Sequence, residues 1–138
     1  MSDKISKHFT WREALWLPRW EREANISDGL NDEIRFNLEY LFKRLDIIRD
    51  LFNVPVIVHC AYRPLAYNLL VKGVVNSCHL SGSAVDFHVD GVDCAEARLT
   101  IIGHNLLSSL KLRMEDRRGD WVHIDTRDPG LNKRFFKP

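Results

Sequence analysis

The sequence predicts an α+β domain in which helices pack on a small antiparallel sheet. Two patterns lead to this prediction: long segments carry apolar residues at helical spacing, and short segments alternate apolar with polar residues as half-buried strands do. With 45% apolar residues among 138, the chain can build a hydrophobic core without disulfides. No internal repeat or low-complexity linker interrupts it, so we expect a single domain over residues 1–138.

The longest predicted helix begins after Asn31, whose side chain can cap the first turn. It ends at the run Asn53–Pro55, because proline cannot continue a helix. Seven apolar residues recur at helical spacing between these limits and are expected to face the core: Ile34, Leu38, Leu41, Phe42, Leu45, Ile48 and Phe52.

Two shorter helices are expected further along the chain. Pro64 suits the first turn of a helix and Gly73 its end, so these two residues bracket the first of them. Asp93, with Glu96 three residues later, resembles a capping box at the start of the second. The apolar stripe of this second helix is expected to continue without a break through Ala97, Ile101, Ile102, Leu106 and Leu110.

Alternating segments predict the strands. Residues 56–58 are typical of a buried strand, and in residues 84–90 Asp86 should face a cleft while its apolar neighbours face the core. In residues 121–125, His123 and Asp125 share one face in the same way. The apolar residues expected to face the core are Val85, Phe87 and Val89 in the first of these two segments, and Val122 and Ile124 in the second.

The last of these strands is expected to form a hairpin with residues 111–115 around a turn at Gly119. The tail over residues 128–138 is expected to be irregular.

Charge and composition exclude several classes of partner. The net charge is +1, with 20 basic and 19 acidic residues, so no basic field is available to bind nucleic acid. No segment approaches the roughly 20 apolar residues that span a bilayer, which predicts no membrane insertion. The N-terminus lacks the apolar run of a secretory signal, so we expect synthesis in the cytoplasm. Three cysteines without paired spacing are expected to be reduced thiols.

Two imidazoles and one carboxylate are the residues that carry most information about chemistry. His79 precedes the strand of Asp86 by a short Ser-Gly-Ser linker, and Gly82 gives that linker the freedom to fold the histidine back. If the strands of Asp86 and His123 are neighbours, all three side chains can meet at one point. Three nitrogen and oxygen ligands with a fourth position open to water are typical of catalytic zinc.

Asp120 lies three residues before His123, which on a regular strand would place it on the opposite face. We expect it instead at the turn entering the strand, where Gly119 permits an irregular backbone that aims the carboxylate at the attacking water. A carboxylate there can accept a proton and return it to a leaving amine, so the expected reaction is amide hydrolysis.

The motifs together resemble a known peptidase family. They are Tyr62-Arg63-Pro64, Asn68, the stretch Ser77 to Asp86 with the pattern His-x-x-Gly-x-x-x-Asp over most of its length, and Asp120-Trp121-Val122-His123. This set is similar to the small, single-domain zinc peptidases of family M15. That family includes bacterial D-alanyl-D-alanine carboxypeptidases and dipeptidases and phage L-alanyl-D-glutamate endolysins. The opening Phe9-Thr10-Trp11-Arg12-Glu13 also resembles the start of such members.

The resemblance implies a role for each matching position. His79, Asp86 and His123 would bind one Zn²⁺, and Asp120 would be the general base and acid. Arg63 would steady the substrate carbonyl and its oxyanion. Substrate contacts would come from Ser77, two residues before the first ligand, and from Tyr62 and Trp121 beside the catalytic positions. The implied fold is the D-alanyl-D-alanine peptidase type, shared with hedgehog domains.

The chain departs from the family pattern near the substrate cleft. His59-Cys60-Ala61 stands where small or hydroxyl residues and often glycine precede the tyrosine and arginine, and Lys72-Gly73 replaces a frequent glycine pair. Two further residues have open alternatives. His88 either lines the site or is solvated, and Asp125 either orients His123 or pairs with Arg127 at the surface.

Three functions follow as alternatives. The first is an endopeptidase that cuts the peptide stem of peptidoglycan, reaching the wall after a separate pore releases it from the cytoplasm. The second is a D-alanyl-D-alanine carboxypeptidase or dipeptidase, for which Arg63 could bind the free carboxylate. The third is a structural or virion module that binds zinc without catalysis. None of the three calls for an obligate protein partner.

Overall fold

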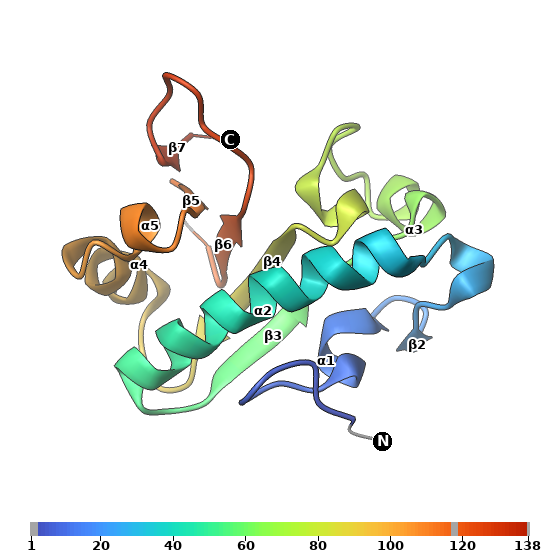
Figure 1. Cartoon of the computed structure of the whole chain (residues 1–138), viewed down its shortest axis with the longest axis horizontal. Coiled ribbons are helices and arrows are strands. Elements are labelled where there is room, and N and C mark those ends of the chain that lie inside the picture. Colours follow the sequence, from blue (N-terminus) through green and yellow to red (C-terminus); the bar gives the residue numbers. More distant parts are fainter. Residues whose placement is uncertain (1–2, 117–118, 138) are drawn as a thin grey trace.

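A five-stranded sheet carries the fold in a computed structural model that describes residues 3–116 and 119–137. The strands are ordered β3-β4-β6-β5-β7, and Figure 1 shows the long helix α2 (Asp32–Phe52) lying across the sheet. Their bounds are β3 Val56–Cys60, β4 Ala84–Val89, β5 Arg113–Glu115, β6 Val122–Asp125 and β7 Phe135–Phe136. Helices packed on a small sheet confirm the predicted α+β class.

The long helix begins and ends where the sequence predicts. The Asn31 side chain accepts a hydrogen bond from the Ile34 amide at 2.9 Å, which satisfies one of the unpaired donors of the first turn. At the other end, Asn53 adopts the left-handed conformation with φ of 54° and closes the helix before Pro55.

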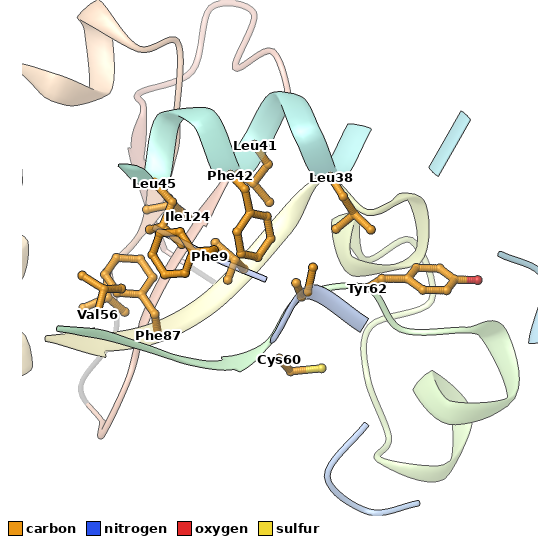
Figure 2. Close-up of a cluster of buried hydrophobic side chains, with 14 of the residues drawn as sticks. Phe9, Leu38, Leu41, Phe42, Leu45, Val56, Cys60, Tyr62, Phe87 and Ile124 are labelled. Carbon is orange, nitrogen blue, oxygen red and sulfur yellow. The ribbon is translucent and has the colours of Figure 1, made fainter. Parts of the chain in front are cut away.

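The core lies between this helix and one face of the sheet (Figure 2). Phe42 of α2 makes an edge contact with Phe9, their ring centroids 5.4 Å apart, and Phe87 of β4 and Ile124 of β6 are fully buried in the same cluster. Because side chains alternate along a strand, the neighbours of Phe87 and Ile124 in the sequence face the opposite side of the sheet. That opposite face holds the polar residues of interest.

The N-terminal segment is held to α2 by one buried carboxylate. Asp46 accepts hydrogen bonds from the Ser6 hydroxyl and from the amides of Lys7 and His8, at 2.9 to 3.0 Å. The segment continues into the short helix α1 (Trp11–Leu15), which Thr10 caps with a capping box. The paired strands β1 (Trp16–Leu17) and β2 (Arg22–Glu23) and the turn η1 (Ile26–Asp28) then lead to α2.

Two predicted elements differ in the structure. The apolar stripe expected to run unbroken to Leu110 is divided between α4 (Cys94–Gly103) and α5 (Leu106–Ser109), because Asn105 adopts a left-handed φ of 57° that no helix can continue through. The tail expected to be irregular contains β7, which pairs in parallel with β5. The sheet is therefore mixed, although its other pairs are antiparallel.

Two short connections complete the chain between β3 and β4. Helix α3 (Leu65–Leu70) begins after Pro64 as predicted but ends before Gly73. The single turn η2 (Cys78–Ser81) directly precedes β4. Among the described residues, no helix is both long and apolar enough to cross a membrane.

Candidate metal centre

His79, Asp86 and His123 converge on the sheet face opposite the core. Their ligand atoms all lie within 4.8 Å of one another, although the residues come from η2, β4 and β6. The strand register explains the meeting of two of them, since Asp86 is paired directly with His123 across the antiparallel ladder. His79 joins them through the turn at Gly82, which has a φ of 73°.

The ring of His79 is oriented by the backbone of the β3 exit. Its Nδ1 donates to the Ala61 carbonyl at 2.6 Å, which leaves Nε2 as the atom facing Asp86, 3.3 Å from Oδ2. The Ser77 hydroxyl caps η2 by accepting from the His79 amide at 3.2 Å. A buried imidazole with one nitrogen fixed in this way presents the other as a lone-pair donor, the arrangement that metal-binding histidines use.

His123 is held between two carboxylates. Nδ1 donates to Asp86 Oδ1 at 2.8 Å, and Nε2 donates to Asp125 Oδ2 at 2.9 Å. Burial alone would lower the pKa of His123, but the hydrogen bonds to Asp125 and Asp86 outweigh it and raise the pKa to about 9. Because Asp125 fixes Nε2 as a donor, Nδ1 is the atom available to a metal.

Asp125 is itself tied to an arginine. It is 1% exposed and accepts from Arg113 Nε and Nη2 at 2.8 and 2.9 Å, a two-point pairing. Burial would raise the pKa of Asp125, yet the bonds from His123 and Arg113 hold it below its usual range. Of the two alternatives for this residue, the structure has the side-chain contact with His123. Arg127 meets Asp125 through its backbone amide, 3.2 Å from Oδ1, while its side chain donates to the Asn76 carbonyl.

Asp86 is ionised in spite of its burial. Removal from water raises the pKa of a carboxyl group, but His79 and His123 outweigh that effect and hold the pKa of Asp86 far below its usual range. Arg63 Nη2 lies 3.3 Å from Asp86 Oδ2, and the Arg63 amide donates to the His79 carbonyl at 2.9 Å. The arginine predicted at the site is therefore anchored beside two of the three ligands.

The residues fit a zinc ion. Two imidazole nitrogens with fixed partners and one ionised carboxylate are the nitrogen and oxygen donors that catalytic zinc uses, and three such ligands leave a fourth position open. They open onto a pocket of about 250 Å³. Its lining also includes five of the residues around the ligands: Arg63, Lys72, Ser77, Glu115 and Trp121.

Predicted substrate residues differ in their placement. Ser77 and Trp121 line the pocket of the ligands, and the Trp121 carbonyl accepts from Arg98 at 2.8 Å, which fixes the entry to β6. Tyr62 belongs to the hydrophobic core, 2% exposed, and is absent from the lining of that pocket. In Figure 2 it lies at one end of the labelled cluster, with its hydroxyl directed away from the phenylalanine rings.

Asp120 lies in the bend two residues before β6, as expected, but its surroundings are not those of the ligands. It lines a neighbouring pocket together with His59 and His88, whose rings are joined by a 2.6 Å contact between His59 Nε2 and His88 Nδ1. Burial, followed by the nearby His88, lowers the pKa of His59, while Asp86 and Asp120 oppose that shift. His59 therefore lies within electrostatic reach of both carboxylates.

Two residues around the centre, Glu115 and Arg113, escaped the sequence analysis, and Lys72 entered it only as a departure from the family pattern. Arg113 and Glu115 lie on β5, whose pairing with β6 sets Arg113 opposite Asp125. The available signal was the alternation of charged, apolar and charged residues in Arg113-Met114-Glu115, which places both charged side chains on the same side of a strand. In the structure only Met114 of the three is fully buried. Lys72 holds a left-handed φ of 58° at one of the positions where the family pattern often has glycine.

Comparison with protein families gives one match. A family profile described as Peptidase M15 matches residues 19–125, which span α2, the β3 exit, η2 and all three candidate ligands. Comparison with curated proteins and with solved structures found no match.

Proposed function

Since the chain belongs to the peptidase M15 family, we propose that it is a zinc-dependent peptidase acting on the peptide stem of peptidoglycan. The observation that carries the proposal is the convergence of His79, Asp86 and His123 on one pocket. Most specifically, we propose an L-alanyl-D-glutamate endopeptidase of the phage endolysin type, which reaches the wall after release by a separate pore.

The charges around the pocket give each residue a part in the reaction. A zinc ion bound by the three ligands would lower the pKa of water and polarise the scissile carbonyl. Arg63, anchored beside Asp86 and His79, can donate to the oxygen of that carbonyl as negative charge develops on it. Ser77 and Trp121 line the pocket where they can contact the peptide on either side of the scissile bond.

Proton transfer between water and the leaving amine needs a further group. The family resemblance nominates Asp120, three residues before His123. Its carboxylate shares a pocket with His59 and His88, so it would have to turn toward the ligands to act in this way.

A carboxypeptidase is the second candidate, and two cations favour it. Arg63 and Lys72 both line the pocket, and either could pair with the carboxylate of a peptide that ends there. An endopeptidase has no such terminal charge to bind. The bond that is cut therefore separates the two candidates.

Mass spectrometry of fragments released from purified peptidoglycan, with and without a chelator, tests the proposal. Chelator-sensitive cleavage between L-alanine and D-glutamate is the expected result, whereas loss of a terminal D-alanine would select the carboxypeptidase. Failure to release any fragment from several wall types would refute a catalytic role and favour a zinc-binding module. A His123→Ala variant should lose zinc and activity, and His104→Ala, an exposed histidine on the C-cap of α4, should keep both.

A further inference from the structure

Arg98 is a buried arginine that pairs with no carboxylate in the part of the chain that the structure describes. It lies on α4 and is 6% exposed. Its Nη2 donates to the Trp121 carbonyl at 2.8 Å, while its Nε, also buried, has no hydrogen-bond partner. Burial of a charge without a counter-charge is destabilising. The stability of the fold therefore does not explain why an arginine occupies this position.

The carbonyl that Arg98 binds belongs to the bend that enters β6. This bend covers residues 119–121, and Trp121 directly follows Asp120. Gly119 and Asp120 make no backbone hydrogen bond to another described residue. Arg98 therefore holds the bend at the residue next to the carboxylate that is nominated for proton transfer.

Helix α4 gives Arg98 a fixed base. Ala97 and Ile101 of this helix are fully buried in the core, and α4 contacts both β4 and β6. Asp93 caps the first turn of the helix by accepting from the Ala95 amide at 3.3 Å. Because α4 is packed on the sheet in this way, the guanidinium links the bend to a rigid element.

We propose that Arg98 is a positioning residue for Asp120, an inference that rests on the peptidase activity proposed above. Asp120 shares its pocket with His59 and His88 and must turn to reach the water at the metal centre. While Arg98 holds the backbone of the bend, this turn needs only a rotation of the Asp120 side chain. Release of the bend would add motion of the backbone, and a catalytic group displaced by about 1 Å is much less effective.

The candidate zinc ligands are held independently of Arg98. His123 is paired with Asp86 across β4 and β6, and its ring donates to Asp86 and Asp125. The hydrogen bond of Arg98 goes to Trp121, two residues before His123. Loss of the Arg98 guanidinium should therefore change catalysis without removing zinc.

The test replaces Arg98 by methionine, which keeps an apolar stem but removes the charge and the donors. Arg44→Met is the matched control. Arg44 of α2 also donates to a backbone carbonyl, that of Leu110, at 2.8 Å, and it lines neither the ligand pocket nor the pocket of Asp120. For each variant we would measure zinc content, thermal unfolding, and kcat and KM on a purified stem peptide of peptidoglycan. Asp120→Asn, alone and combined with Arg98→Met, completes the set.

Arg98→Met should lower kcat by about 100-fold, change KM by a smaller factor, and retain one zinc. Its melting temperature should equal or exceed that of the wild type, because a buried charge without a counter-charge is removed. In the Asp120→Asn background the same substitution should cost much less, since the two residues act on one step. Arg98→Lys, which keeps a charged donor, should recover part of the lost kcat. Arg44→Met should keep the kcat and the zinc content of the wild type.

Several results would overturn the proposal. Near-normal kcat in Arg98→Met would remove Arg98 from the reaction. A loss in the double variant equal to the product of the two single losses would show that Arg98 does not act through Asp120. Loss of zinc or of folding in Arg98→Met would assign the residue to the metal centre or to the fold instead. A wild-type protein that binds zinc but cleaves no stem peptide would refute the proposed peptidase itself, which is a different outcome from these.

Discussion

Replacing Asp125 by asparagine should weaken zinc binding although Asp125 is not one of the three ligands. The carboxylate accepts from three residues at once. Arg113 Nε and the Arg127 amide donate to Oδ1, and Arg113 Nη2 and His123 Nε2 donate to Oδ2. An amide of the same shape has only one accepting oxygen. Its NH₂ group must then face Arg113 together with either His123 or the Arg127 amide.

If the amide faces His123, it donates to Nε2 and stabilises the tautomer with the proton on Nδ1. That proton occupies the atom required for zinc. Loss of the partner that orients a ligand costs about 10- to 100-fold in metal affinity. This corresponds to about 1.4 to 2.7 kcal/mol of binding free energy.

Folding stability should fall as well. Asp125 is 1% exposed and the Arg113 side chain 15%, so the substitution leaves a largely buried guanidinium without its counter-charge. Removal of one partner from such a pair costs about 3 kcal/mol. For a chain of this length, that loss lowers Tm by roughly 10 °C.

A competition titration with a chromogenic chelator would measure zinc affinity, and thermal unfolding of the metal-free protein would measure stability. Asp28→Asn is the matched control. Asp28 accepts a similar two-point contact from Arg22, at 2.7 and 2.9 Å, and does not line the ligand pocket. The control should leave zinc affinity unchanged. Unaltered zinc affinity in Asp125→Asn would refute the argument that Asp125 selects the tautomer of His123.

Three further outcomes are expected. Zinc binding should release one proton from His123, because the pKa of this histidine is raised to about 9. Zinc affinity should therefore increase by about tenfold per pH unit up to that value and then level off. Calorimetry in buffers of different ionisation enthalpy measures the proton release. Gly82→Ala should destabilise the fold by at least about 1 kcal/mol, because the φ of Gly82 is +73° and the new Cβ would lie 3.0 Å from the Ile34 carbonyl oxygen. Thermal unfolding measures this loss. The control Gly103→Ala should show no comparable loss, because nothing lies within 4 Å of a Cβ at that position. Asn31→Ala should cost about 1 kcal/mol in urea unfolding with an unchanged m-value, since it removes only the cap of α2.

The sign of the His123 effect on folding is opposite to its effect on zinc. A pKa raised by folding stabilises the metal-free protein at low pH, where the imidazole is charged. That contribution is complete below about pH 6.5, the usual value for histidine, and is lost as pH rises through about 9. Metal-free protein should therefore lose stability over the same range in which zinc affinity increases.

Local patterns were enough to predict the elements that depend on neighbouring residues. Asn31 and the stripe of α2 are such a case, because capping and burial of one helix face act within a few turns. The break between α4 and α5 was missed for the converse reason. An apolar stripe continues through Asn105 in the sequence, and the left-handed backbone there is not visible in that stripe.

The sequence by itself determined the residues of the candidate metal centre, since His79, Asp86 and His123 combine suitable donors with strand alternation and a glycine turn. Only the tertiary structure decided what surrounds them. The pairing of β5 with β6 brings Glu115 into the pocket and gives Asp125 its arginine, while Asp120 faces a different pair of histidines. Register between strands far apart in the chain depends on how the whole sheet packs, so distance along the sequence carries little information about it.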